Sequence, residues 1–421
     1  MADILENKAF PSSILDTDLY KLTMQQAVLQ HFPNVHAVYH FTNRTRTTSF
    51  SRQCVDNFQE SVSRFTNLAL TESERTWLES TCPYLSKDYL DYLSAFRFNP
   101  DQVSITFIPD SENNMSGQIE IEASGPWVET ILWEVPLMAT LSETYFQTDD
   151  TDWNYEGQEE LAFDKGKTLF EAGCSVSEFG TRRRRSFQTQ DLVVRALIRA
   201  AKENTNTGGR LNGTSNVHLA RKYGSTPIGT IAHEWFMAIG ALKGYENVNE
   251  LALQCWEEVY AKTPTTLIAL TDTFSTEAFF KEFMQDPGRA QKWTGLRQDS
   301  GDPLVFAPRV KEAYQALGIN YREKLVVYSD ALNVNKVLAI QKQCKELGFE
   351  RVGYGIGTFL TNDFRRLSSG EKSKALNIVI KIQSVDGRPC VKLSDDPTKV
   401  TRETKTLSST SRRYSSCSIV T

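Results

Sequence analysis

Apolar side chains near the start of the chain recur at helical spacing. From Tyr20 to Val28 they occupy one stripe at every third or fourth position, which predicts an amphipathic helix. Asp16 precedes this stripe and can cap the helix, and Phe32-Pro33 would end it. We therefore expect the chain to open on one helix that lies between these two signals.

The residues that follow alternate between apolar and polar, as in a β-strand. Residues 35–42 place His36 and His40 on one face, where we expect both side chains to point outward rather than to bind a ligand. Two further β segments, 104–108 and 118–123, flank a turn-rich stretch and predict a hairpin. This first part of the chain therefore indicates a mixed α/β domain.

From about residue 156 the pattern changes to short apolar runs that alternate with longer helical segments. Alternation of this kind is typical of βα units and of a parallel sheet. A series of such units predicts a (β/α) barrel, and a doubly wound sheet is the alternative, because the sequence does not show whether the sheet closes. The runs expected to form strands are 175–179, a short run ending near 213, 227–231, 266–270, 293–296, 325–328 and 352–355.

The β pattern returns after Gly370. Residues 375–383 and 389–393 flank Asp386-Gly387, a pair that is typical of the tight turn in a hairpin. We expect this hairpin to pack back on the N-terminal domain.

These changes of pattern divide the chain into three parts. An N-terminal α/β domain covers 1–145, an α/β barrel that holds the active site covers 146–365, and a C-terminal β segment covers 366–421. The last part ends in a stretch rich in Ser and Thr, 401–421, which we expect to be poorly ordered.

The composition is that of an ordinary globular protein and excludes several classes. The 421 residues are 40% hydrophobic and 24% charged, which is enough to bury a large core. With 47 basic and 52 acidic residues the formal net charge is −5, so we expect no nucleic-acid partner. No apolar run approaches the roughly 20 residues of a membrane-spanning helix, so we expect no membrane partner. Neither heptads nor a large apolar stripe indicates an oligomeric state.

The N-terminus and the cysteines bear on the cell compartment. Met1–Phe10 carries charged residues and lacks the apolar core of a conventional secretory signal. The seven cysteines are odd in number and widely spaced, without a C-x-x-C pair. We therefore expect reduced thiols, no structural metal, and a cytoplasmic protein that also fits the nucleus.

Charged and glycine residues follow several of the expected strands, at the edge of a parallel sheet that usually carries function. The run Arg182–Arg185 can bind phosphate if alternate arginines point into the mouth of the barrel, whereas a solvated basic patch or a nuclear-import signal is the alternative. Gly355-x-Gly357-Thr358 can approach a phosphate through backbone N–H groups and a hydroxyl, although such a pair of glycines is more often a plain turn.

One loop combines an arginine with two carboxylates. Arg297, Asp299 and Asp302 can hold a polyanionic substrate together with its Mg²⁺. The alternative is an internally paired helix start that Asp302 caps before Pro303.

Two further groups lie at expected strand ends. Ser329 and Asp330 follow one strand, and His233 follows the expected strand 227–231. A lone histidine is usually structural, but the placement of His233 near the mouth makes it a candidate for catalysis. His218 has no comparable placement and is expected to be structural.

Five motifs, taken in order, resemble the nicotinate phosphoribosyltransferases, and their texture is most similar to that of the fungal members. The similarity extends from about residue 14 to about residue 396, and five ordered motifs are far more specific than any one of them. The motifs are Leu15–Met24 (LDTDLYKLTM), Glu178–Arg183 (EFGTRR), Gly229–Glu234 (GTIAHE), Arg297–Asp302 (RQDSGD) and Gly355–Thr358 (GIGT).

The resemblance implies a fold and a reaction. The fold is that of type II phosphoribosyltransferases, an irregular α/β barrel beside an α/β domain built from both chain ends. The reaction joins nicotinate to 5-phosphoribosyl 1-diphosphate, giving nicotinate mononucleotide and diphosphate, as the entry step of NAD salvage. ATP hydrolysis is coupled to it through a phosphohistidine. The implied partners are thus three small substrates, including ATP, with Mg²⁺ bound to their phosphates and no dedicated metal site on the protein.

The resemblance also implies roles for individual residues. His233 is implied as the phosphohistidine, with Asp299 beside it in the reaction. The residues implied in nicotinate binding are Tyr20, Thr230, Arg297 and Ser215, and those implied in phosphoribosyl diphosphate binding are Arg182, Ser329, Asp330, Gly357 and Thr358.

One position separates the sister families. The related nicotinamide phosphoribosyltransferases carry an aspartate after a Gly-Thr pair, whereas here Gly213-Thr214 is followed by Ser215. Without that carboxylate the negatively charged nicotinate is not repelled, which favours the acid over the amide. Two alternatives stay open: an enzyme for nicotinamide, and a non-catalytic barrel that binds a phosphorylated metabolite. His233 and Arg297 argue against the second.

Overall fold

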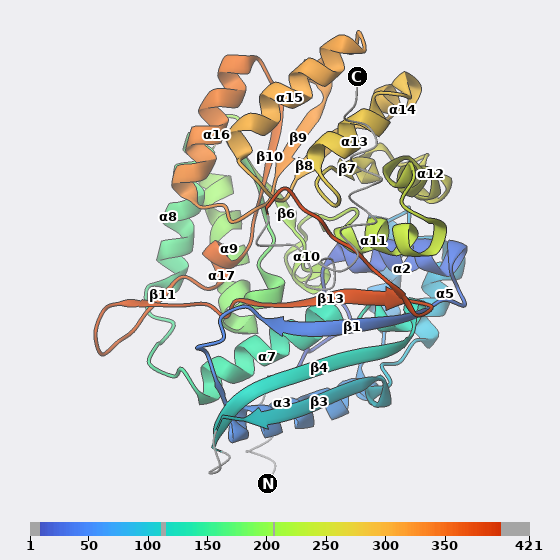
Figure 1. Ribbon diagram of the computed structural model, residues 1–421. Helices are drawn as coiled ribbons and strands as arrows, with labels where there is room; N and C mark the ends of the chain where they lie inside the picture. The colour runs from blue at the N-terminus through green and yellow to red at the C-terminus, as the bar shows by residue number, and fades with distance from the viewer. Residues whose placement is uncertain (1–8, 111–114, 205–206, 397–421) are drawn as a thin grey trace.

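The computed structural model describes residues 9–110, 115–204 and 207–396 (Figure 1). The N-terminal stretch before residue 9, the tip of the first hairpin and the Ser- and Thr-rich tail 401–421 lie outside the described residues. Two six-stranded sheets organise the described part, one antiparallel and one parallel, and helices cover them.

The antiparallel sheet is built from both ends of the chain, as expected. Its order is β14-β13-β1-β4-β2, and β3 pairs with β4. β1 lies between β4 and β13 and is antiparallel to both, so the C-terminal hairpin packs on the N-terminal domain. The strands are β1 (His36–Asn43), β2 (Phe50–Ser51), β3 (Val103–Pro109), β4 (Ser116–Pro126), β13 (Ile378–Val385) and β14 (Arg388–Pro389).

Two predictions made from local sequence patterns are confirmed in this sheet. The expected turn at Asp386 and Gly387 has φ angles of 46° and 71°, the two left-handed positions that a tight hairpin turn requires. His36 and His40 are both exposed on β1, so the prediction that they point outward is confirmed.

The first helix begins later than expected. α2 spans Leu19–His31, and Phe32 ends it, as predicted. Asp16 does not cap this helix, so that prediction was wrong. Its carboxylate instead accepts two hydrogen bonds of 2.7 Å from Arg184, because a buried guanidinium needs a charged partner more than a helix end needs a cap.

Helices surround both sheets. In the N-terminal part they are α3 (Arg52–Ser63), α4 (Glu72–Thr81), α5 (Lys87–Ala95), α6 (Trp127–Thr130) and α7 (Glu134–Thr148). Around the parallel sheet they are α8 (Gln158–Glu171), α9 (Phe187–Glu203), α10 (Val217–Tyr223), α11 (His233–Lys243), α12 (Val248–Tyr260), α13 (Thr276–Phe283), α14 (Pro287–Lys292), α15 (Pro303–Ala316), α16 (Val334–Leu347) and α17 (Thr358–Thr361). Among the described residues no helix is long and apolar enough to cross a membrane.

The parallel sheet has the order β6-β5-β10-β9-β8-β7. Every neighbouring pair in it is parallel, as the alternation of strands and helices predicted. A short hairpin, β11 (Phe364–Arg365) with β12 (Lys372–Ser373), follows it. The parallel strands are β5 (Ser175–Glu178), β6 (Arg210–Thr214), β7 (Ile268–Leu270), β8 (Gly295–Gln298), β9 (Leu325–Tyr328) and β10 (Arg351–Ile356).

One expected strand is absent from this sheet. Within 227–231 only Pro227 forms a bridge, to Thr214, so the prediction of a full strand was wrong. Proline lacks the N–H that a ladder needs. In addition, Gly229 lies against helix α2, where a Cβ atom would come within 2.8 Å of the backbone nitrogen of Tyr20. The segment therefore turns toward the N-terminal domain.

The strands of the parallel sheet surround a cavity of about 680 Å³. Strand residues with small side chains, such as Ser175, Ser177 and Gly353, line it. The segment 226–230 and the approach to β7 complete its wall, between the two edge strands of the sheet. This arrangement is the irregular α/β barrel that was expected.

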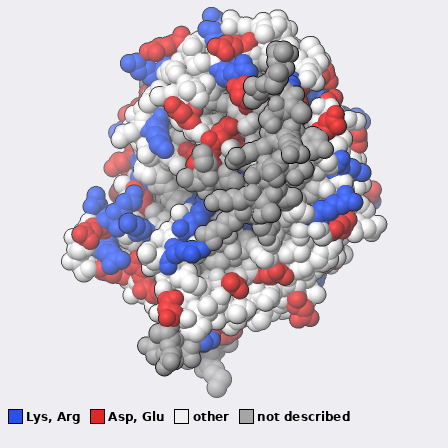
Figure 2. Space-filling view, viewed as in Figure 1, with Lys and Arg blue, Asp and Glu red and all other residues white. Residues whose placement is uncertain are grey.

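Charges are mixed over the face of the molecule shown in Figure 2. Acidic and basic side chains are interspersed there, and a group of basic ones lies at the edge where Figure 1 places the β11–β12 hairpin. Among the residues drawn in colour on this face, the acidic side chains are thus spread out rather than gathered into one acidic surface.

Candidate active site

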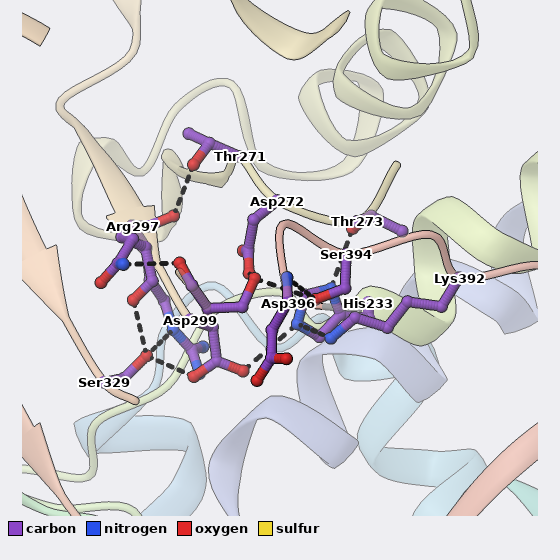
Figure 3. A network of polar contacts seen from close by, with 12 residues as sticks. His233, Thr271, Asp272, Thr273, Arg297, Asp299, Ser329, Lys392, Ser394 and Asp396 are labelled. Carbon is purple, nitrogen blue, oxygen red and sulfur yellow. Dashed lines mark hydrogen bonds and ion pairs between the residues drawn. The ribbon is translucent and has the colours of Figure 1, made fainter. Parts of the chain in front are cut away.

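His233 is the first residue of α11, and its ring meets residues from two strand ends (Figure 3). Nδ1 lies 3.0 Å from Oγ1 of Thr273, which follows β7. Nε2 lies 3.2 Å from Oδ2 of Asp299, which follows β8, and 2.9 Å from Nζ of Lys392. The structure therefore brings together side chains that are up to 159 positions apart in the sequence.

This environment keeps the imidazole neutral. Burial and the neighbouring ammonium of Lys392 lower the pKa of His233 to about 3. At neutral pH one ring nitrogen therefore carries no proton, and its lone pair is available as a nucleophile.

Asp299 is the centre of a polar network at the end of β8. Arg297 donates from Nε to Oγ of Ser329 at 2.8 Å, and Ser329 donates to Oδ1 of Asp299 at 2.7 Å. Burial alone would raise the pKa of Asp299, but the charge of Arg297 and weaker interactions beside it outweigh burial and hold it well below the usual value. Asp299 is therefore a fixed negative charge beside the histidine.

Asp272 is a second carboxylate behind this network. It is fully buried and accepts a hydrogen bond from the hydroxyl of Ser300. Burial, and then the charge of Asp299, raise the pKa of Asp272 to about 7. The two carboxylates thus differ in charge, because arginine faces only one of them.

A second cavity of about 490 Å³ opens at the carboxyl ends of the strands, next to this network. The residues expected to bind phosphoribosyl diphosphate all line it, namely Arg182, Ser329, Asp330, Gly357 and Thr358. Arg183, from the predicted arginine run, lines it as well, and so does Arg44 from the end of β1, which was not singled out from the sequence. With Arg297, four arginines surround this cavity, which favours a polyanionic ligand.

The arginine run is divided between this cavity and the core. Residues 181–183 form a single helical turn, so Arg182 and Arg183 both face the cavity. Arg184 and Arg185 are only 3% and 0% exposed. The prediction that alternate arginines face the mouth was therefore wrong, because the segment coils instead of staying extended. The alternative of a solvated basic patch was wrong as well.

The other two loops agree in part with their predictions. Asp302 caps α15 by accepting from the backbone N–H of Leu304 at 2.9 Å, with Pro303 in the first turn. Asp302 is thus a helix cap, as the alternative interpretation predicted, whereas Asp299 faces the cavity. The Gly357-Thr358 pair lies between β10 and α17, at the cavity wall.

Of the four residues expected to bind nicotinate, two line a cavity and two do not. Arg297 lines both cavities, and Thr230 lines the interior one. Tyr20 donates from its hydroxyl to Oε2 of Glu134 at 3.3 Å, and it lines neither cavity. Ser215 is 4% exposed and donates to Oδ1 of Asp18 at 2.7 Å, again away from both cavities.

Phe179 was missed in the sequence and lies where the two cavities meet. It lines both of them together with Arg297, whose guanidinium lies 6.0 Å from the centre of the phenyl ring. The available signal was an aromatic residue at the end of an expected strand, within the Glu178–Arg183 motif.

A buried ionic network joins the N-terminal domain to the start of α11. Nζ of Lys21 lies 2.6 Å from carboxylate oxygens of both Glu134 and Glu234. Tyr39 and Trp127 also donate to Glu234, the residue after His233. Burial alone would lower the pKa of Lys21, but the two glutamates outweigh burial and raise it. The network fixes the first turn of the helix that carries His233, and no local pattern in the sequence predicted it.

Within the described residues, no group of three or more His, Cys, Asp or Glu side chains is placed to hold a metal ion. The six described cysteines are all free. Most of them are buried, and burial raises the pKa of the Cys174 and Cys344 thiols to about 11. These thiols are therefore inert rather than nucleophilic.

The chain is similar to known proteins over most of its length. Residues 174–416 match the model of the nicotinate phosphoribosyltransferase (NAPRTase) family, and residues 15–142 match the model of its N-terminal domain. The chain is 42% identical over 393 residues to a probable nicotinate phosphoribosyltransferase of Schizosaccharomyces pombe, covering 92% of this chain and 94% of that protein. It is 40% identical over 417 residues to the nicotinate phosphoribosyltransferase of Saccharomyces cerevisiae, covering 96% of both.

Solved structures show the same similarity. The crystal structure of a putative nicotinate phosphoribosyltransferase from Saccharomyces cerevisiae superposes with a TM-score of 0.92 at 38% identity, over 97% of this chain and 99% of that one. The enzyme from Porphyromonas gingivalis superposes with a TM-score of 0.85 at 33% identity, over 96% and 99%. Family models, relatives and structures agree on one assignment, and the chain belongs to the nicotinate phosphoribosyltransferase family.

Proposed function

We propose that this protein joins nicotinate to 5-phosphoribosyl 1-diphosphate and releases nicotinate mononucleotide and diphosphate, with ATP hydrolysis coupled through phosphorylation of His233. One observation carries the proposal. In a member of this family, a neutral histidine at the start of a helix lies beside an ionised aspartate at the end of β8, next to a cavity with four arginines in its wall.

The arginine-lined cavity is the proposed site of the phosphoribosyl diphosphate. Diphosphate leaves the anomeric carbon with its electron pair while the ribose gains oxocarbenium character. Arg182 and Arg183 neutralise the leaving group, and the hydroxyls of Ser329 and Thr358 donate to phosphate or ribose oxygens. The backbone at Gly357 lets a phosphate approach closely, and Asp330 accepts from the ribose hydroxyls.

The nicotinate site is proposed at the junction of the two cavities. The guanidinium of Arg297 pairs with the pyridine carboxylate, and Thr230 lies on the interior side of the same junction. Phe179 offers an aromatic face to the pyridine ring. Tyr20 and Ser215 are proposed from their positions in the family motifs. Tyr20 donates to Glu134, which forms an ion pair with Arg182 of the cavity wall, and Ser215 donates to Asp18.

ATP coupling is proposed to act through charge. His233 begins α11, so the positive end of the helix dipole lies beside any phosphoryl group that the ring receives. Mg²⁺ neutralises substrate phosphates when they are bound. Asp299 is ionised and lies in the cavity wall with Asp330, so these carboxylates suit a cation that arrives with the phosphates. The free cysteines support a reducing compartment, the cytosol or the nucleus.

The decisive experiment supplies ATP, Mg²⁺ and 5-phosphoribosyl 1-diphosphate with either nicotinate or nicotinamide, and identifies the product by mass spectrometry. The expected product is nicotinate mononucleotide, with ADP and phosphate. Turnover of the amide instead of the acid would assign the protein to the sister activity. Binding of 5-phosphoribosyl 1-diphosphate without turnover of either base would favour a non-catalytic binding protein.

A further inference from the structure

A strap of seven residues, 390–396, runs beside His233 after the last strand of the antiparallel sheet (Figure 3). The backbone N–H groups of Leu393 and Ser394 donate to the carbonyl of Thr273 at 3.1 and 3.2 Å. The hydroxyl of Ser394 donates to that of Ser300 at 3.0 Å. The strap is therefore tied to the loops after β7 and β8, the same two loops that contact the histidine ring.

Lys392 extends from this strap to the ring. It is 6% exposed, and its Nζ lies 2.9 Å from Nε2 of His233. An ammonium only donates hydrogen bonds, so this contact requires the tautomer in which the proton is on Nδ1, beside Thr273, and Nε2 accepts from Lys392 instead of donating to Asp299. Asp272 and Asp299 are the carboxylates whose charge the ammonium influences, and Arg297 is the cation on the far side of Asp299.

We propose that Lys392 is the cation that holds the phosphoryl group on His233 and that it makes the strap 390–396 respond to phosphorylation. The inference rests on the proposed function. In the step concerned, the unprotonated ring nitrogen attacks the terminal phosphorus of ATP and forms the N–P bond. The bond from that phosphorus to the bridging oxygen breaks, ADP leaves with the electron pair, and the ring proton stays on the other nitrogen.

The physical reason is the change in charge at the ring. Before transfer, the partner of Lys392 is a neutral nitrogen. After transfer, the ring carries a phosphoryl group of about −1.5 to −2 charge with three strong acceptor oxygens, which the positive charge of the protonated ring offsets only in part. The flexible four-carbon stem of lysine lets the ammonium move from the nitrogen to these oxygens. Hydrogen bonds between charged groups are roughly twice as strong as neutral ones, so the phosphorylated ring binds the strap more tightly.

A phosphoenzyme assay tests the role of Lys392. The wild type, Lys392→Met and Lys392→Arg are incubated with radiolabelled ATP and Mg²⁺, quenched in alkali, and the bound label and its rate of loss are measured. Lys374→Met is the matched control, because Lys374 is an exposed lysine of the same C-terminal segment. We expect Lys392→Met to lower the phosphoenzyme level or its lifetime by about tenfold or more. Lys392→Arg should restore most of it, and the control should match the wild type.

The outcomes separate this inference from the proposed function. No label on the wild type would refute the phosphohistidine itself. A labelled wild type with an equally labelled and equally long-lived Lys392→Met variant would refute only the role of Lys392. A purely structural role predicts that Lys392→Met and Lys392→Arg lose label in proportion to a loss of thermal stability. If Lys392→Met does not fold, Lys392→Gln keeps a polar side chain without the charge and replaces it in the same assay.

Discussion

The two halves of the arginine run have the same chemistry in the sequence and opposite roles in the structure. Arg182 and Arg183 line the cavity, where Arg182 also lies 3.1 Å from Glu134. Arg184 is buried against the carboxylate of Asp16, and Arg185 is buried among aromatic rings, with its guanidinium 3.6 Å from the ring centre of Phe146. A cluster of charge therefore indicates where a ligand can bind, but it does not indicate which members of the cluster reach that ligand.

The largest expected effect is on the buried ion pair. Arg184→Ala leaves the carboxylate of Asp16 buried without its cation, which typically costs about 3–5 kcal/mol. We therefore expect the free energy of unfolding to fall by that amount, measured by denaturant titration followed by circular dichroism. A variant as stable as the wild type would show that water or His218 replaces the guanidinium. Arg184 would then contribute no more to stability than the arginines that line the cavity.

The next largest effect is expected at Arg297, which lines the cavity from the end of β8. Removing one member of a desolvated charged pair costs about 2–5 kcal/mol, so Arg297→Ala should raise the KM for nicotinate at least tenfold. Initial rates at saturating 5-phosphoribosyl 1-diphosphate measure it. If instead only the KM for the phosphoribosyl substrate rises, Arg297 belongs to the phosphate site.

Arg183→Ala tests whether Arg183 belongs with Arg182 in the cavity or with Arg184 in the core. The guanidinium lies in the cavity wall, and burial together with repulsion by Arg182 lowers its pKa to about 10, so it is fully charged at neutral pH. A charge-assisted hydrogen bond contributes about 1.5–3 kcal/mol, which corresponds to a KM for 5-phosphoribosyl 1-diphosphate raised about tenfold or more. Thermal unfolding serves as the control and should change little. Loss of stability without loss of substrate affinity would move Arg183 to the structural half.

Ser215→Asp tests a polar residue that is buried like Arg184 yet is proposed to affect the substrate. Ser215 lines neither cavity, so a carboxylate there repels nicotinate more weakly than a direct neighbour would, and kcat/KM for the acid relative to the amide should fall by less than about tenfold. The new charge also faces Asp18, whose pKa burial already raises, so stability is measured in parallel. A folded variant with lower stability and an unchanged ratio would limit Ser215 to holding Asp18.

The smallest effect is expected at Arg185. Its Nε and Nη1 atoms are buried without a hydrogen-bond partner, and Nη2 donates to Ser373 at 2.9 Å. Burial lowers the pKa of Arg185 to about 10. An apolar side chain of similar length, as in Arg185→Met, loses cation–π contacts but avoids desolvating a charge, so the free energy of unfolding should change by about 1 kcal/mol or less. A loss as large as that of Arg184→Ala would show that the aromatic surroundings hold the charge strongly.

Local patterns predicted much of the fold. The antiparallel hairpins, the turn at Asp386 and Gly387, and six strands of the parallel sheet follow from alternation and turn residues that act over a few positions. The errors arose where a distant contact outweighed the local signal. Asp16 has the chemistry of a helix cap but pairs with Arg184, and the segment at Pro227 has the hydrophobicity of a strand but packs on α2.

The sequence by itself determined the family, the order of the strands and helices along the chain, and the set of strand ends at which chemistry is expected, because these depend on motifs and short-range periodicity. The tertiary structure decided which side chains meet. His233 contacts Lys392 across 159 positions, and Arg184 contacts Asp16 across 168. Such pairings depend on burial, and burial depends on how whole elements pack. Two arginines that are adjacent in the sequence can therefore differ completely in role, because one turn of backbone directs one into a cavity and the other into the core.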